Sequence, residues 1–278
     1  MKFALITGCS HGGIGHALAS EFQRHHDIHV FATARSLSKM EQLAHFPNVT
    51  LLVLDVTSPT SIDAAVAAVA RQTGGRLDFL VNNAGLQCVM PVLDLDIESA
   101  RCMYEVNFWG VFAVTRAFAP LVIAAQGTIA NLSSVGTMIS MPYLVTYASS
   151  KAACEVFSEG LRRELAPLGV NVATVIVGGV QTNIHNNQLE ASLPEDSLYR
   201  PISKFIADRA SGRDSIGYLG SVNDFAKGLV NDLLRGVTGK IYHGKMSWFF
   251  IVARFFPSWL MDRLAVQGSG LETLAAPV

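Results

Sequence analysis

Short apolar runs recur along the first two-thirds of the chain, and segments long enough to form helices separate them. Runs of this length predict buried strands, and their alternation with helical segments predicts a parallel sheet covered by helices on both faces. The expected strands are Phe3–Ile6, Val30–Thr33, Thr50–Leu54, Phe79–Val81, Thr128–Leu132 and Val172–Val177. We therefore predict an α/β fold of the Rossmann-like, doubly wound type.

The pattern weakens after Val180. Residues Thr182–Tyr218 are polar and irregular, which is typical of a long substrate loop or lid. No linker, low-complexity tract or repeat interrupts the earlier part of the chain. We expect one catalytic domain over residues 1–245, with the loop at about 183–218, and an apolar extension over residues 246–278.

Composition narrows the classes of protein that fit this pattern. Of the 278 residues, 50% are hydrophobic and 15% are charged, and the net charge is −1, which argues against a disordered chain and against nucleic-acid binding. The mean hydropathy of +0.34 is high, and doubly covered strands explain part of it. Cysteines and histidines show no ligand spacing, so we expect no metal site and a reducing, cytoplasmic location. The apolar run at the N-terminus is too short for a signal peptide.

A glycine-rich turn, Thr7–Gly15, follows the first expected strand and opens a helical segment. Glycine lets the backbone turn tightly and approach a pyrophosphate, whose charge then lies at the N-terminus of the helix. Glycines also occur in turns that bind nothing. Their number and their place between a strand and a helix favour a dinucleotide site with contacts from Gly8, Ser10, Gly13 and Ile14.

The end of the second expected strand carries Arg35, where NAD-binding proteins of this fold usually carry an acid. A carboxylate would repel a 2′-phosphate, whereas a guanidinium binds it through two hydrogen bonds, so Arg35 favours NADP over NAD. The alternative is that Arg35 is a solvated loop residue. Asp55 closes the third strand, next to Val56, and either accepts a hydrogen bond from the adenine amino group or caps the following helix.

Tyr147 and Lys151 are four residues apart, a spacing that places them on the same face of a helix. A ketone that receives hydride at carbon must receive a proton at oxygen, and a tyrosine hydroxyl can donate that proton. A nearby cation favours the ionised phenol, and Lys151 could also bind the nicotinamide ribose. Ser134 follows the strand Thr128–Leu132, so its hydroxyl can reach the same edge of the sheet and hold the substrate oxygen.

Asn107 lies in an apolar segment, Val106–Ala119, where a polar amide needs a partner. Two explanations stay open. Asn107 either holds a water molecule that passes protons on from Lys151, or it satisfies buried backbone groups.

Together these residues resemble the classical short-chain dehydrogenase/reductase (SDR) family. The matching residues are the Thr7–Gly15 turn, Asn82–Gly85 after the fourth strand, Asn107, Ser134, and Tyr147 with Lys151, all in family order. The resemblance implies NAD(P)-dependent carbonyl and alcohol chemistry. Tyr147 would then be the acid and base, Ser134 the orienting group, Lys151 the ribose ligand, and Asn107 the end of a proton relay.

The resemblance also implies further cofactor contacts from Asn82, Gly85, Val180 and Thr182, with Thr182 reaching the carboxamide. The sequence departs from the family pattern at two places. One extra residue separates Gly8 from Gly13, and the stretch before Thr182 lacks the usual proline. These departures and the apolar C-terminus are similar to the fungal branch that includes NADPH-dependent 1-acyldihydroxyacetone phosphate reductase.

Trp248–Met261 is the most apolar stretch of the chain. It is shorter than the roughly 20 residues of a spanning helix, and Arg254 and Pro257 interrupt it, so we do not expect it to cross a membrane. Aromatic residues beside Lys245 and Arg263 would suit peripheral contact with a lipid surface, with the endoplasmic reticulum or lipid droplets as candidate locations. A lid over the substrate pocket and an oligomer contact are the alternatives.

Four basic residues in the substrate loop could meet a substrate phosphate: Arg200, Lys204, Arg209 and Arg213. Acidic residues lie among them, which favours a solvated surface of mixed charge. In addition, the helices expected over Val106–Ala119 and Tyr147–Leu165 are apolar on more than one face, and in family members such helices often pair across a dimer axis. We expect a homo-dimer or homo-tetramer.

The leading hypothesis is an NADPH-dependent reductase that converts a ketone to an alcohol on an apolar small molecule, lipid-like or a secondary metabolite. The hydride would come from the nicotinamide and the proton from Tyr147. One alternative is an NADP-dependent alcohol or steroid dehydrogenase that works in the oxidative direction. Another is a non-catalytic NADP-binding regulatory module, against which the intact set of Ser134, Tyr147 and Lys151 argues.

Overall fold

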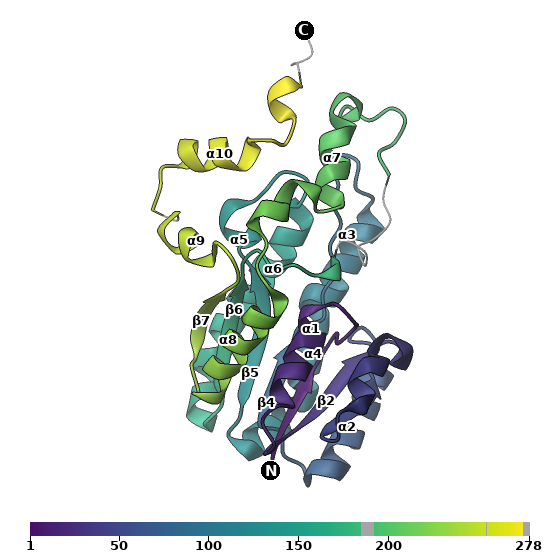
Figure 1. Cartoon of the computed structure of the whole chain (residues 1–278), viewed down its shortest axis with the longest axis vertical. Helices are drawn as coiled ribbons and strands as arrows, with labels where there is room; N and C mark the ends of the chain where they lie inside the picture. Colours follow the sequence, from purple (N-terminus) through teal and green to yellow (C-terminus); the bar gives the residue numbers. More distant parts are fainter. Residues whose placement is uncertain (185–191, 254, 275–278) are drawn as a thin grey trace.

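Seven parallel strands form one sheet in the computed structural model, in the order β3-β2-β1-β4-β5-β6-β7 (Figure 1). The strands are β1 Lys2–Ile6, β2 Ile28–Ala34, β3 Val49–Val53, β4 Phe79–Asn82, β5 Thr128–Ser134, β6 Asn171–Val177 and β7 Gly239–His243. The structure describes residues 1–184, 192–253 and 255–274. All six expected strands are present within a residue or two of their expected bounds. The sequence pattern missed β7, which pairs with β6 at the edge of the sheet and carries few aliphatic residues.

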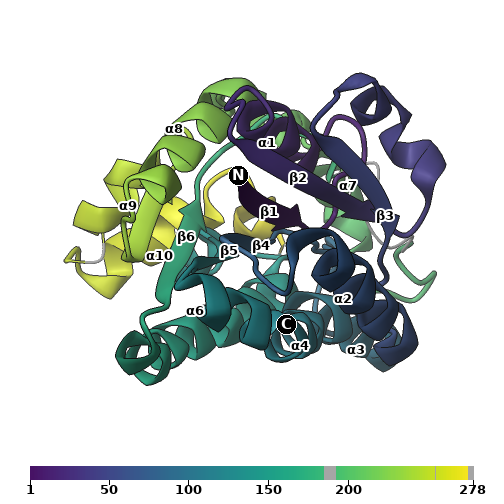
Figure 2. The same cartoon turned by 90° about the horizontal axis from the view of Figure 1, so that it is seen from below.

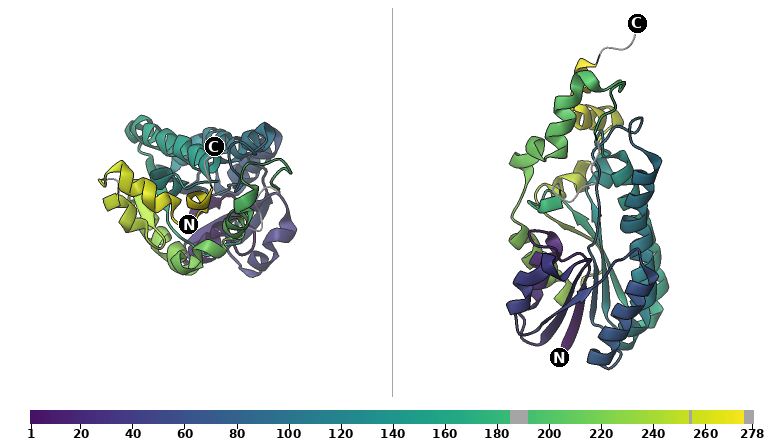
Figure 3. Two further views of the ribbon diagram at one scale, coloured as in Figure 1. Left: turned by 90° about the horizontal axis from the view of Figure 1, so that it is seen from above. Right: turned by 90° about the vertical axis from the view of Figure 1, so that its right-hand side faces the viewer.

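Helices cover both faces of the sheet, as Figures 2 and 3 show. One face carries α1 (Ile14–Phe22), the 3₁₀ segment η1 (Leu37–His45) and α8 (Val222–Leu234). The other carries α2 (Pro59–Thr73), α4 (Gly110–Ala125) and α6 (Val145–Leu165). Alternate residues of each strand serve the two cores, so Ala4 and Ile6 pack with α1 and α8 while Leu5 packs with α2 and α4. The predicted Rossmann-like α/β fold is confirmed.

The helix that carries Asn107 is not uniformly α-helical. It consists of α3 (Ile97–Tyr104), a π-helical turn η2 (Glu105–Trp109) and α4, and Asn107 lies inside the π-helical turn. Such turns are frequent at functional sites because they re-aim side chains. By length and composition the whole helix, Ile97–Ala125, could cross a membrane. Its α4 part packs against the sheet and α2, so we interpret its apolar character as that of a core helix.

Two segments lie above the carboxyl ends of the strands (Figure 1). The expected irregular loop contains short helices: η5 (Arg200–Ile202), α7 (Ser203–Ala210) and η6 (Arg213–Tyr218). This part of the expected loop is therefore partly helical, while residues 185–191 of the loop lie outside the described residues. The C-terminal segment forms α9 (Ser247–Ala253), α10 (Ser258–Val266) and the 3₁₀ turn η7 (Leu271–Thr273). Arg254 and residues 275–278 also lie outside the described part.

A buried polar network joins the centre of the sheet to the helices on one face. Asn82 on β4 donates from Nδ2 to Thr115 Oγ1 (2.9 Å) and to Asn131 Oδ1 (2.8 Å). Asn131 on β5 in turn donates to Ser158 Oγ on α6 (2.9 Å). Asn131 and Ser158 are fully buried. The network therefore fixes α6 relative to β4 and β5, the elements whose ends form the site described below.

We expect Asn131→Ala to lower the free energy of unfolding by about 2–4 kcal/mol, because Asn82 and Ser158 each lose a buried hydrogen bond. Urea titration of the purified variant measures the change. Asn231→Ala is the matched control because Asn231 is exposed on α8, and it should stay within about 0.5 kcal/mol of the wild type. Equal losses in the two variants would contradict the role of the network.

Candidate active site

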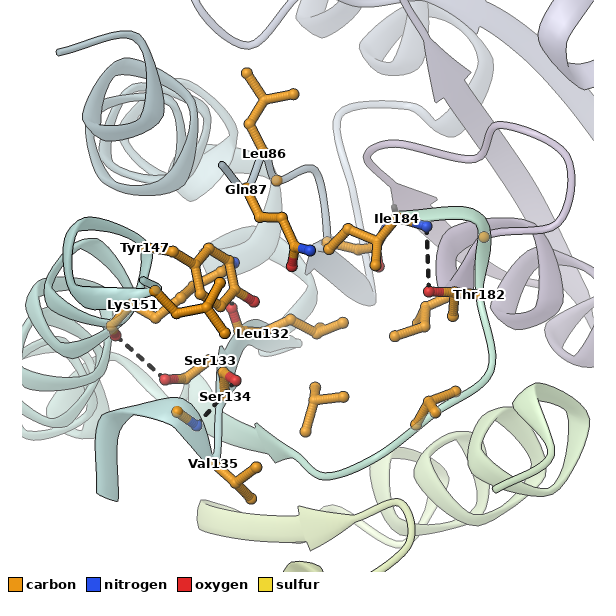
Figure 4. Close-up of a pocket in the computed structure, with 18 of the residues that line it drawn as sticks. Leu86, Gln87, Leu132, Ser133, Ser134, Val135, Tyr147, Lys151, Thr182 and Ile184 are labelled. Atoms are coloured by element: carbon orange, nitrogen blue, oxygen red, sulfur yellow. Dashed lines mark hydrogen bonds between the residues drawn. The ribbon is translucent and has the colours of Figure 1, made fainter. Parts of the chain in front are cut away.

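The carboxyl ends of the strands open into a cavity of about 910 Å³. Ligands of open α/β sheets bind at this edge, and the volume suits a small molecule. Figure 4 shows Ser134, Tyr147 and Lys151 on one side of the cavity, facing Thr182 and Ile184 on the other.

Most of the residues predicted for the site line this cavity. They are Gly8, Ser10, Gly13, Ile14, Arg35, Asp55, Val56, Gly85, Ser134, Tyr147, Lys151, Val180 and Thr182. Asn82 and Asn107 are not among the lining residues. The motifs therefore predicted which segments form the cavity. Asn82 and Asn107 need a different explanation.

The glycine-rich turn after β1 packs tightly against neighbouring backbone. Gly8 has φ of +74°, and a Cβ there would lie 2.9 Å from Ala84 Cα; a Cβ on Gly15 would lie 2.5 Å from the Gly8 carbonyl. Larger residues do not fit at either position. Gly13 is the N-cap of α1 and has no side chain to cap the helix, so the first N–H groups of the helix stay available to an anion.

The extra residue in this turn has a structural role. Gly12 also has φ of +74°, and its carbonyl accepts a hydrogen bond from the Asn183 N–H (3.1 Å). Asn183 Nδ2 donates to the His11 carbonyl (3.3 Å), and a Cβ on Gly12 would collide with the Asn183 side chain. The longer turn thus contacts the loop that follows β6.

Two cations lie where the second strand ends. Arg35 and Lys39 are exposed and line the cavity. No ion pair involves either side chain within the described part of the chain. Lys39 was not predicted, although its position four residues after Arg35 could have been noticed. This corner of the cavity is therefore electropositive and free to bind an anion.

Asp55 does not cap a helix. Its Oδ1 accepts hydrogen bonds from the Thr57 N–H (2.9 Å) and the Thr57 hydroxyl (2.7 Å). The N-cap of α2 is Ser58, whose Oγ accepts from the Ser61 N–H. The capping alternative for Asp55 is wrong, and its carboxylate lies at the cavity edge beside Val56.

Asn82 and Asn83 have different roles because neighbouring strand residues point to opposite sides. The Asn82 side chain lies in the buried network with Thr115 and Asn131 and does not line the cavity, so the expected contact of Asn82 with a cofactor stays a prediction without support from this geometry. Asn83 lines the cavity, and its Nδ2 donates to the carbonyls of Thr7 (2.7 Å) and Gly8 (3.1 Å). Asn83 therefore holds the glycine-rich turn, a role that the sequence reasoning missed.

Ser134, Tyr147 and Lys151 converge from β5 and α6. Lys151 is only 5% exposed, and its Nζ donates to the Leu132 carbonyl (3.0 Å). Ser134 Oγ accepts a hydrogen bond from the Gly136 N–H (3.1 Å), which leaves its own proton available for a ligand. The arrangement places two hydroxyl groups and one ammonium group on the same wall of the cavity.

The Asn107 amide is fully buried and satisfies backbone groups, as one of the two explanations predicted. Its Oδ1 accepts from the Leu86 N–H (2.8 Å), and its Nδ2 donates to the Leu86 carbonyl (2.8 Å) and to Ser150 Oγ (2.9 Å). A Cβ on Gly85 would lie 3.2 Å from Asn107 Oδ1 and 3.3 Å from Lys151 Nζ. Asn107 therefore joins the Gly85–Gln87 loop to α6, the helix that carries Lys151.

The loop after β6 completes the opposite wall. Val180 forms an isolated bridge with Gly220, and Thr182 Oγ1 accepts from the Ile184 N–H at 3.4 Å. Both residues line the cavity, although this stretch lacks the usual proline.

The C-terminal segment forms part of the wall. Phe249 and Phe250 of α9 line the cavity, and so does Leu264 of α10. Trp248 (66% exposed) and Trp259 (65% exposed) face outward instead. The lid interpretation thus accounts for the inward side chains, which the sequence reasoning did not separate from the outward ones.

The four cysteine thiols differ in accessibility. Burial raises the pKa of Cys9 to about 12, and it also raises the pKa of Cys88 and of Cys154. Cys102 is exposed and lines the cavity. Only the thiolate is strongly nucleophilic, so the buried thiols should be inert in the folded protein.

Comparison with known proteins gives consistent matches in sequence and in fold. The family model described as short chain dehydrogenase matches residues 2–192. The short-chain dehydrogenase ptmH of Penicillium ochrochloron is 44% identical over 272 residues, which cover 98% of this chain and 99% of that protein. The NADPH-dependent 1-acyldihydroxyacetone phosphate reductase of Schizosaccharomyces pombe is 41% identical over 229 residues, which cover 81% of this chain and 76% of the relative. The solved structure of a short chain dehydrogenase from Burkholderia cenocepacia in complex with NADP matches with a TM-score of 0.71, at 25% identity and with 100% of both chains covered.

We expect iodoacetamide at neutral pH to modify Cys102 before any other cysteine, because burial and raised pKa values keep Cys9, Cys88 and Cys154 as thiols. Peptide mass spectrometry after short exposure locates the label. Cys102→Ser should remove nearly all early labelling of the folded protein. Equally fast modification of a buried cysteine would contradict the packing around it.

Proposed function

Because the chain belongs to the short-chain dehydrogenase family, we propose that it reduces a ketone to an alcohol on an apolar substrate, with NADPH as the hydride donor. The observation that carries this proposal is the convergence of Ser134, Tyr147 and Lys151 on a cavity that has a cationic corner and an apolar wall. Membership of the family confirms the predicted oxidoreductase class, with chemistry at a CH–OH group, a nicotinamide cofactor and a small-molecule substrate. The lipid-like or secondary-metabolite nature of the substrate and the reductive direction are the proposed part.

Three features of the cavity fit a phosphorylated dinucleotide. The closed glycine turn and the uncapped start of α1 suit a pyrophosphate. The exposed pair Arg35 and Lys39 suits a 2′-phosphate, which supports NADP over NAD. Lys151 Nζ has N–H donors to spare for ribose hydroxyls.

We assign the binding of this cofactor to the residues that both the sequence and the cavity indicate, and we add Asn83 and Lys39. The sequence-predicted members are Gly8, Ser10, Gly13, Ile14, Arg35, Asp55, Val56, Gly85, Tyr147, Lys151, Val180 and Thr182. When bound, the nicotinamide supplies the hydride that the carbonyl carbon receives.

The side chains around the carbonyl supply the rest of the chemistry. Ser134 donates a hydrogen bond to the substrate oxygen and stabilises the negative charge that develops there. The Tyr147 hydroxyl donates its proton to the same oxygen, and the Lys151 ammonium stabilises the phenolate that remains. Asn107 acts as a positioning residue through its bonds to Leu86 and Ser150, and the proton relay that the resemblance implies for it stays a prediction.

The same residues serve alcohol oxidation, so the oxidative alternative differs only in direction. The regulatory-module alternative has no use for a proton donor. The complete set of Ser134, Tyr147 and Lys151 at one cavity therefore supports an enzyme.

We further propose how the chain is organised. Residues 1–245 form the catalytic domain, with the substrate loop at about 183–218, and residues 246–278 form an extension, of which Phe249, Phe250 and Leu264 line the cavity. A homo-dimer through α4 and α6 is supported by exposed apolar side chains on these helices and the adjoining π-helical turn, namely Trp109, Phe112 and Val156. We propose a cytoplasmic location. Lipid contact through residues 248–261 stays a prediction, for which the exposed Trp248 and Trp259 are the relevant side chains.

Tyr147→Phe should lower kcat for ketone reduction by about 10²- to 10⁴-fold, because the proton donor is lost. The affinity for NADPH, measured by fluorescence titration, should change little. Tyr104→Phe is the matched control because Tyr104, on α3, does not line the cavity, and it should keep full activity. A Tyr147→Phe variant with normal turnover would exclude Tyr147 as the donor.

Arg35→Ala should weaken NADPH binding by about 10- to 100-fold and leave NADH binding unchanged, because only NADPH carries the 2′-phosphate. Lys39→Ala should act in the same direction with a smaller effect, since its single ammonium makes no bidentate contact. Arg24→Ala, an exposed arginine that does not line the cavity, serves as the control. If Arg35→Ala weakened both cofactors equally, Arg35 would not be the phosphate ligand.

A further inference from the structure

The part of the cavity built by the C-terminal segment is mostly apolar. Phe249, Phe250 and Leu264 come from α9 and α10, and Met141 and Leu144 come from the segment before α6. These side chains suit the apolar body of a substrate. Burying a charged side chain in such a wall costs free energy unless hydrogen bonds or an opposite charge compensate it.

One arginine is buried in this wall. Arg209 of α7 is 7% exposed and lines the cavity. Its Nε donates to Asp214 Oδ2 (2.8 Å) and its Nη1 donates to the Pro142 carbonyl (3.1 Å). The guanidinium also lies 5.7 Å from the centre of the Tyr143 ring, which holds it in a fixed orientation.

These contacts leave part of the guanidinium unused. Arg209 Nη2 makes no hydrogen bond to any described residue, and Arg209 lines the cavity, so this edge of the guanidinium is available to a ligand bound there. A guanidinium with a free edge binds carboxylates and phosphates well, because several of its N–H donors lie in one plane.

A second cation lies at the same short helix. Lys245 lines the cavity, and its Nζ donates to the Gly217 carbonyl (2.9 Å) near the end of η6, while Arg209 binds Asp214 near the start of η6. Each of the two cations keeps unused N–H donors. Asp214 is the carboxylate that lines this part of the cavity, so the local charge is positive.

The other basic residues of the loop differ from Arg209. Lys204 and Arg213 are exposed and both pair with Asp208, and Arg200 is exposed and bonds the Pro194 carbonyl. None of these three lines the cavity. These three residues form the solvated mixed-charge surface that the sequence predicts. Arg209 does not belong to that surface, because it is buried.

We propose that Arg209, supported by Lys245, binds an anionic oxygen group of the substrate, such as a carboxylate or a phosphate. This inference rests on the reductase function proposed above and specifies its substrate as an apolar ketone with an acidic group besides the reacting carbonyl. Asp214 orients the guanidinium through Nε and leaves Nη2 to the substrate. Phe249, Phe250 and Leu264 contact the apolar part between the two polar groups.

Binding can be tested without turnover. Isothermal titration calorimetry of the protein saturated with NADP compares decanoate, decyl phosphate and decanol, which share one alkyl chain. We expect at least one of the two anions to bind about 10- to 100-fold more tightly than decanol, as hydrogen bonds to a charged group imply. The tighter of the two anions identifies whether the acidic group is a carboxylate or a phosphate.

Variants separate binding from a purely structural role. Arg209→Met should remove the preference for the anion and leave decanol binding within about threefold of the wild type, since decanol makes no charge-assisted hydrogen bond. Lys245→Met, at an exposed position, should reduce the preference in part. Asp214→Asn should raise anion affinity several-fold, because it removes a like charge while its amide oxygen still accepts the bond from Nε. Arg213→Met is the matched control and should change nothing.

Equal affinity of the wild type for all three ligands would overturn the proposal. It would also be overturned if Arg209→Met weakened decanol and the anions alike, since Arg209 would then only support the fold. Should Arg209→Met fail to fold, unchanged anion preference in both Lys245→Met and Asp214→Asn would overturn it. A protein that shows the anion preference but reduces no ketone would contradict the proposed function and not the anion site.

Discussion

A buried ammonium group is the feature on which the rest of the site depends. Lys151 is almost fully buried, its Nζ bonds the Leu132 carbonyl, and no carboxylate pairs with it among the described residues. Because an unpaired buried charge is costly, the backbone around Lys151 must be held in place. Gly85 is suited to this position because a side chain there would press on Lys151 Nζ and Asn107 Oδ1. The remaining N–H donors of Lys151 make this wall favourable for ligand oxygen atoms.

Polar tethers hold the helix that carries Lys151 and Tyr147. Ser150 of α6 binds Asn107, and Ser158, two turns further along the same helix, binds Asn131 of β5. Helix α6 is thus fixed both to the π-helical turn and to the central strand, so that its hydroxyl and ammonium groups keep a constant position relative to Ser134. The hydrogen bonds that stabilise the core therefore also hold the reacting side chains in place before a substrate binds.

Sequence reasoning predicted the sheet and the convergence of the motif residues, because strand and turn patterns are local and parallel strands end at one edge. It failed where the answer depends on which way a side chain faces. Asn82 and Asn83 are adjacent, yet one lies in the core and the other holds the glycine turn. Arg209 could not be distinguished from the loop's other cations, because its burial beside the Tyr143 ring is a tertiary effect. Strand β7 was missed because its short edge sequence lacks an apolar run.

The cavity combines a cationic corner suited to NADPH, a wall with a proton donor and an apolar part that contains the buried Arg209. The central claim is that a ketone bound in this cavity receives hydride from NADPH and a proton from Tyr147. The most direct test is incubation of the purified protein with a panel of apolar ketones and NADPH that carries deuterium at the transferred position, followed by mass spectrometry of the alcohols. The account predicts an alcohol with one deuterium on its carbinol carbon. Alcohol without the label, or no reduction of any ketone in the panel, would contradict it.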